Sequence, residues 1–220
     1  MSTSALPLRS RTSTAWARAA LADPLALLDD HAHLERKAAT NALALLTRWP
    51  QPAREADADA VATRWSKVLA AVAKDEAEHL ALVVKILSRR GGVLGRVHAN
   101  PYAAALRELV RRGRGADELV DRLLVCALIE ARSCERFERL AEVAEDDELR
   151  RLYRGLLASE RGHFRIFLDL ARGVPGGREV ETRWDVLLDE EARILRAQPP
   201  GPRMHAGDPG PPEPSIPGPA

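Results

Sequence analysis

Two copies of a Glu-x-x-His motif lie within apolar runs whose hydrophobic residues repeat about every 3.5 positions, as in packed helices. Residues three apart share one face of an α-helix, so the Glu and the His of each motif can bind the same metal ion. A single Glu on another apolar run precedes each motif. The six residues are Glu35, Glu76, His79, Glu130, Glu160 and His163.

The apolar seams of the four runs show that these residues face a core. Apart from Ser133, the six are the only polar residues on the seams of residues 25–49, 65–86, 119–140 and 149–170. Four buried carboxylates need compensating positive charge, and no seam Lys or Arg provides it. Bound metal would provide it, and mixed carboxylate and imidazole ligands favour iron or manganese over zinc or calcium. We therefore predict a site for two iron ions.

A structural role for the same residues is the alternative. In that case the carboxylates are protonated, solvated through a loose core, or paired with nearby arginines, for which the sequence offers Arg36, Arg132 and Arg161.

Composition and connectivity favour an all-α fold, since 30% of the 220 residues are charged and only 4% are aromatic. Helices are predicted at residues 23–49, 58–90, 117–144 and 147–172, with a short helix at 101–112 in the long connection and a fifth at 180–197. Short, long and short connections predict a ferritin-like four-helix bundle with a long crossover between helices 2 and 3 and an extra C-terminal helix. The predicted division is a loose N-terminal arm (1–22), a ferritin-like di-iron domain (23–197) and a disordered Pro/Gly-rich tail (198–220).

The location predicted from the sequence is cytoplasmic, with no membrane partner. No apolar stretch is long enough for a signal peptide or a membrane span. Cys126 and Cys134 lie eight residues apart on one predicted helix, beyond disulfide reach, and are expected to be core residues.

Four stretches of the chain resemble the MiaE family of tRNA-modifying hydroxylases: residues 30–39, 74–79, 129–137 and 157–164. The similarity covers about residues 22–195. It implies a non-haem di-iron monooxygenase that hydroxylates the isopentenyl group of 2-methylthio-N6-isopentenyladenosine next to the tRNA anticodon, using dioxygen and two electrons. The implied partners are the tRNA anticodon loop and an external electron donor, either an electron-transfer protein or a reductase. The six residues above match the iron ligands of that family, and His31, one turn before Glu35, is a candidate to contact a ligand.

The connection between residues 89 and 114 is rich in arginine and contains one acid, Glu108. Its basic residues are candidates for tRNA phosphate binding: Arg89, Arg90, Arg96, Arg107, Arg111, Arg112 and Arg114. Tyr102 is a candidate for stacking on a base. The alternative is that these arginines are ordinary solvated residues of an exposed connection and bind nothing.

Two other functional classes remain open from the sequence. A ferritin-like or rubrerythrin-like protein that oxidises iron or reduces peroxide uses nearly the same ligands, although the chain has no Cys-x-x-Cys pair. A non-enzymatic helical scaffold would use the Glu and His residues structurally.

Overall fold

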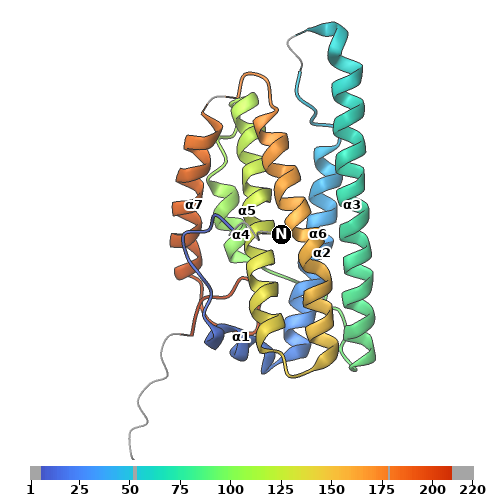
Figure 1. Cartoon of the computed structure of the whole chain (residues 1–220), viewed down its shortest axis with the longest axis vertical. Helices are drawn as coiled ribbons and strands as arrows, with labels where there is room; N and C mark the ends of the chain where they lie inside the picture. The colour runs from blue at the N-terminus through green and yellow to red at the C-terminus, as the bar shows by residue number, and fades with distance from the viewer. Residues whose placement is uncertain (1–5, 52–53, 178, 210–220) are drawn as a thin grey trace, which may run out of the picture.

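The computed structural model describes residues 6–51, 54–177 and 179–209. In this part of the chain we find seven α-helices, a single 3-10 turn and no strand (Figure 1). The α-helices are α1 (Thr14–Leu21), α2 (Pro24–Leu45), α3 (Ala58–Arg89), α4 (Pro101–Glu108), α5 (Ala116–Val143), α6 (Asp147–Arg172) and α7 (Val180–Arg196), and the 3-10 turn η1 is Glu55–Asp57.

Four of these helices form the bundle, as two packed hairpins. Helix α2 packs against α3 and α5 packs against α6, and the four run side by side along the long axis of the molecule (Figure 1). The connections within the hairpins are short, whereas residues 90–115 form a crossover that carries α4. The predicted ferritin-like bundle with a long crossover and an extra C-terminal helix is therefore confirmed. None of the helices described is long and apolar enough to cross a membrane.

Local sequence signals explain where the helices begin and end. Asp23 accepts a hydrogen bond from the Ala26 amide at 3.0 Å and is followed by a first-turn proline, so it caps α2. Asp146 caps α6 through the Glu148 amide at 2.9 Å and the Leu149 amide at 3.0 Å. Helix α4 is shorter than predicted because the Arg111 amide donates to Asp121 on α5 at 2.9 Å instead of continuing the helix.

The predicted loose arm over residues 1–22 is wrong for the described part, which begins at residue 6. Trp16 on α1 is fully buried against α5, and the guanidinium of Arg136 lies 3.9 Å from the centre of its ring. The amide and hydroxyl of Thr12 both donate to the Glu135 carboxylate, at 2.7 and 2.5 Å. The polar composition that suggests a solvated arm instead supplies partners for buried charges on α5.

The predicted disordered tail is also partly ordered. Met204, His205 and Ala206 are buried, and the Met204 amide donates to Asp30 on α2 at 2.8 Å. Arg136 donates to the Ala206 carbonyl at 3.0 Å. The rest of the predicted tail, residues 210–220, lies outside the described residues.

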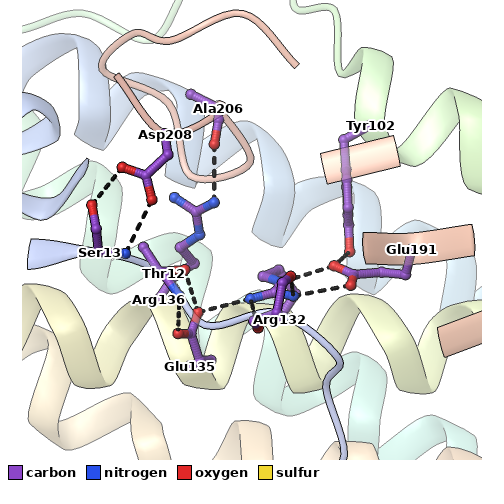
Figure 2. A network of polar contacts seen from close by, with 10 residues as sticks. Thr12, Ser13, Tyr102, Arg132, Glu135, Arg136, Glu191, Ala206 and Asp208 are labelled. Atoms are coloured by element: carbon purple, nitrogen blue, oxygen red, sulfur yellow. Dashed lines mark hydrogen bonds and ion pairs between the residues drawn. The ribbon is translucent and has the colours of Figure 1, made fainter. Parts of the chain in front are cut away.

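Arg132 is the centre of a buried polar network that joins these outer segments to the bundle (Figure 2). It donates to both carboxylate oxygens of Glu191 on α7, at 2.8 and 2.9 Å, and to Glu135 at 3.0 Å. The hydroxyl of Tyr102 on α4 also donates to Glu191, at 2.9 Å. Tyr102 is fully buried and stacks on His205, so the prediction that it stacks on a base is wrong.

Candidate metal centre

The six residues singled out from the sequence meet inside the bundle, contributed by all four of its helices. Single ligand atoms of Glu35, Glu76, His79 and Glu160 lie within 4.8 Å of one another. A second group shares Glu76 and Glu160 and adds Glu130 and His163, again within 4.8 Å. Five of the six residues are buried and His79 is nearly so, with 11% of its side chain exposed. Two overlapping groups that share two carboxylates are suited to two adjacent metal ions.

Several atoms in this cluster lack a hydrogen-bond partner. The Nδ1 atom of His163 lies 2.7 Å from Oε1 of Glu76, and Nδ1 of His79 lies 3.3 Å from Oε1 of Glu160. None of these four buried atoms makes an aligned hydrogen bond within the described residues. Buried polar atoms are normally paired, so unpaired atoms converging on one space fit a metal that they would ligate.

The electrostatics of the cluster show what balances its charge when no metal is bound. Burial, reinforced by the neighbouring carboxylates, raises the pKa of Glu35 and of Glu130 well above the ordinary value. Burial also opposes ionisation of Glu76, but contacts with His163 and His79 outweigh it and lower the pKa of Glu76 to about 2. The carboxylates around His79 overcome its own burial and raise its pKa to about 12. Without metal, protons therefore supply the positive charge that the site needs.

Arginine pairing does not neutralise this site. Arg132 pairs with Glu191 and Glu135, and Arg161 pairs with Glu138. No Lys or Arg among the described residues makes an ion pair with any of the six. This excludes the alternative in which Arg36, Arg132 or Arg161 compensates the carboxylates.

Residues next to the cluster orient its members. His31 is buried, and its Nε2 atom lies 2.5 Å from Oε1 of Glu35. On α6, Nε2 of His163 faces Asp75 Oδ2 at 3.4 Å, which leaves Nδ1 directed at Glu76. Partners of this kind fix the ring orientation of metal-ligating histidines. Sequence reasoning did not find Asp75, because it is only partly buried and lies off the apolar seam of α3.

The arginine-rich connection is less positive than its composition suggests. Arg89 and Arg90 pair with Glu148, Arg111 pairs with the buried Asp121, and Arg112 pairs with Glu108. The remaining candidates, Arg96, Arg107 and Arg114, make no ion pair within the described residues. Phosphate binding by this connection stays a prediction. These three arginines are the candidates whose charge no ion pair offsets in the described part of the chain.

Comparison with known proteins assigns the chain to a family. The model of the family described as tRNA-(MS[2]IO[6]A)-hydroxylase (MiaE) matches residues 2–206. The chain belongs to the MiaE family. A relative named tRNA 2-(methylsulfanyl)-N(6)-isopentenyladenosine(37) hydroxylase, from Pseudomonas putida, is 36% identical over 198 residues, covering 90% of this chain and 91% of that protein. A protein of the same name from Salmonella typhimurium is 32% identical over 136 residues, covering 62% of this chain and 49% of its own.

A solved structure extends the likeness of this MiaE-family chain to the level of the fold. It is described as protein 43 with aldehyde deformylating oxygenase activity from Synechococcus. The TM-score is 0.79 at 35% sequence identity, and the match covers 91% of this chain and 96% of that one. The likeness agrees with a ferritin-like di-iron fold and with the carboxylate and histidine cluster inside the bundle.

Proposed function

We propose that this protein is an O2-dependent non-haem di-iron monooxygenase that hydroxylates the isopentenyl group of 2-methylthio-N6-isopentenyladenosine in tRNA. The convergence of Glu35, Glu76, His79, Glu130, Glu160 and His163 at the centre of the bundle carries the proposal. The names of two relatives support the substrate and reaction. An external electron donor and a cytoplasmic location follow from the same reading and stay predictions.

Each of the six residues has a defined part in holding metal. Glu76 and Glu160 belong to both groups of ligand atoms, so they would contribute to holding both ions. Glu35 with His79 completes one group, and Glu130 with His163 completes the other. When bound, two iron ions would supply the redox chemistry that activates dioxygen for insertion of one oxygen atom into a C–H bond.

The surrounding residues keep the ligands oriented and keep water out. His31 holds the Glu35 carboxylate through the 2.5 Å contact, and Asp75 fixes the ring of His163. One turn from the candidate ligands on the same helix faces, Val72, Leu156 and Phe167 are buried and apolar. An apolar shell of this kind limits competing reactions with solvent.

Iron oxidation or peroxide reduction by a ferritin-like or rubrerythrin-like protein is the alternative use of such a site. The MiaE family match over residues 2–206 and the two hydroxylase relatives favour the tRNA hydroxylase.

Metal analysis of ligand variants tests the proposal. The parent protein, reconstituted anaerobically with ferrous iron, should bind about two irons per chain, as expected for a carboxylate-bridged pair. Glu130→Ala and Glu160→Ala should each lose iron and activity. Glu78→Ala is the matched control, because Glu78 lies on α3 between two candidate ligands but is exposed and pairs with Lys74. Activity is read as a one-oxygen mass gain in nucleosides from undermodified tRNA. Equal iron retention in all three variants would refute the ligand assignment.

A further inference from the structure

A cavity of about 440 Å3 opens between α2, α4 and α5 and reaches the candidate metal centre. Glu130, which is 6% exposed, forms part of its wall. A larger cavity of about 700 Å3, beside Arg18 and Asp146, contains none of the six candidate ligands. The smaller cavity is therefore the one of interest, because a candidate metal ligand lines it. We call it the Glu130 cavity.

Much of the wall of the Glu130 cavity is apolar. Its buried or partly buried hydrophobic residues come from α2, α5, α6 and the crossover just after α4, and include Leu34, Ala38, Val110, Val125, Ile129 and Phe167. Its size falls within the range of about 300–1,000 Å3 that small-molecule sites occupy. An apolar wall leading to a metal ligand suits a branched hydrocarbon group better than a polar or charged one.

The outer rim of the same cavity is positively charged. Arg36 and Lys37 on α2, Arg107 on α4 and Arg122 on α5 all belong to its lining. Arg36 and Arg107 are exposed and make no ion pair among the described residues, whereas Arg122 pairs with Glu118. Lys37 contacts the imidazole of His98 at 2.7 Å and donates to the His98 carbonyl at 3.3 Å. Exposed arginines without an ion pair, as Arg36 and Arg107 are, favour an anionic ligand such as a phosphate.

We propose that the Glu130 cavity receives the prenyl group of a modified adenosine, while Arg36, Lys37 and Arg107 bind phosphates of the RNA on either side of that nucleotide. The inference rests on the proposed hydroxylase function and extends it by naming the substrate pocket and the phosphate contacts. The nucleotide must leave its stack to enter, which a single-stranded anticodon loop allows at low cost. Only Arg107 belongs to both this rim and the arginine-rich connection; the rim otherwise lies on α2 and α5.

Binding measurements with three probes test the pocket. The probes are an anticodon stem-loop RNA that carries 2-methylthio-N6-isopentenyladenosine, the same RNA with unmodified adenosine, and the free modified nucleoside. Burying even half of the isopentenyl group should make the modified RNA bind about 30-fold tighter than the unmodified RNA. Equal binding of the two RNAs by iron-loaded protein would overturn the inference.

Cavity-filling variants localise the effect. Ala38→Phe fills the apolar wall from α2, and Ala103→Phe fills it from α4, which carries no candidate ligand. In each variant the ratio of the affinity for the modified RNA to that for the unmodified RNA should fall to near one, and binding of the free nucleoside should be abolished. Ala71→Phe, at an exposed position on α3 outside the cavity, is the control and should keep the preference. Unchanged preference in both cavity variants would overturn the inference.

Rim variants test the phosphate contacts separately. The double variant Arg36→Ala with Arg107→Ala should bind both RNAs more weakly. The slope of the logarithm of the binding constant against the logarithm of the salt concentration should become shallower by about 1.4, because each lost contact with a single-stranded phosphate removes about 0.7. Its affinity for the free nucleoside should not change. Arg151→Ala with Arg154→Ala, two exposed arginines on α6, is the matched control and should keep the slope. An unchanged slope in the rim variant would overturn the phosphate contacts.

Iron content separates failure of this inference from failure of the proposed function. If the parent protein binds no iron after reconstitution, the proposed hydroxylase function is refuted. Retained iron with unaltered RNA discrimination in the cavity variants would refute the pocket alone.

Discussion

Removing the carboxylate of Glu191 should destabilise the protein far more than removing its neighbour Glu190. Glu191 and Arg132 are both 0% exposed, and two of the hydrogen bonds that Arg132 donates go to Glu191. Glu191→Ala leaves Arg132 buried with Glu135 as its one remaining carboxylate partner, and leaves the Tyr102 hydroxyl without its acceptor. Breaking a buried ion pair from one side costs about 3–5 kcal/mol, a large part of the roughly 5–15 kcal/mol that stabilises a typical domain.

Guanidinium unfolding of metal-free protein, followed by circular dichroism, measures this loss. Glu190→Ala is the matched control: Glu190 makes an exposed pair with Arg193, which is worth at most about 1 kcal/mol. The double variant Glu191→Met with Arg132→Met removes both charges and should be more stable than Glu191→Met alone. A loss of less than about 1 kcal/mol for Glu191→Ala, or a double variant no more stable than the single one, would refute the reasoning.

Two further predictions concern titration and tyrosine hydroxyls. In the metal-free protein His79 keeps its proton up to a pKa of about 12, whereas the unfolded group loses it near its ordinary value of 6.5. Its contribution to stability is therefore fully present below pH 6.5 and is lost as pH rises toward 12, so the free energy of unfolding should fall between about pH 7 and pH 9. Ferrous iron must displace this proton, so iron binding should tighten over the same range and release protons in a pH-stat titration; pH-independent binding would contradict this. Tyr102→Phe removes a hydrogen bond to buried Glu191 and should cost about 1.5–3 kcal/mol in urea unfolding. Tyr153→Phe should cost close to nothing, because the buried Tyr153 hydroxyl has no hydrogen-bond partner in the described residues; equal losses would contradict the assignment.

The four bundle helices and their six polar seam residues could be predicted because the inner seam is periodic. Glu35, Glu76, Glu130 and Glu160 interrupt otherwise apolar positions, so each stands out against its own helix. The predicted helix starts at residues 23 and 147 agree to within one residue with the observed starts of α2 and α6.

The second layer could not be predicted in the same way. Helix α5 is buried on both faces, because α1 and α7 cover the side that the bundle leaves free. Arg132, Glu135 and Glu191 therefore look like ordinary solvated helix residues in the sequence, although they are among the most buried charges in the protein. The periodicity of apolar residues identifies one buried face of a helix. It gives no information on which distant segments of the chain cover the opposite face.

Counting charges in the sequence overestimated the positive charge of the arginine-rich connection for a related reason. The acids that pair with Arg90 and Arg111 lie outside it, at Glu148 on α6 and Asp121 on α5. Local composition predicted an excess of positive charge that folding largely cancels. The basic rim of the Glu130 cavity, by contrast, is assembled from residues on three helices and has no local signature.

The long-range hydrogen bonds of the N-terminal segment and of residues 204–208 have a consequence for how the protein is made. Thr12 bonds Glu135 across 123 residues, Asp30 bonds Met204 across 174, and Ser13 bonds Asp208 across 195. In a chain synthesised from its N-terminus, all six candidate ligands emerge before Met204 and Asp208, which bond α2 and the N-terminal segment. A chain truncated before these residues therefore carries every candidate ligand but lacks the hydrogen bonds that Met204 makes to α2 and Asp208 makes to the N-terminal segment.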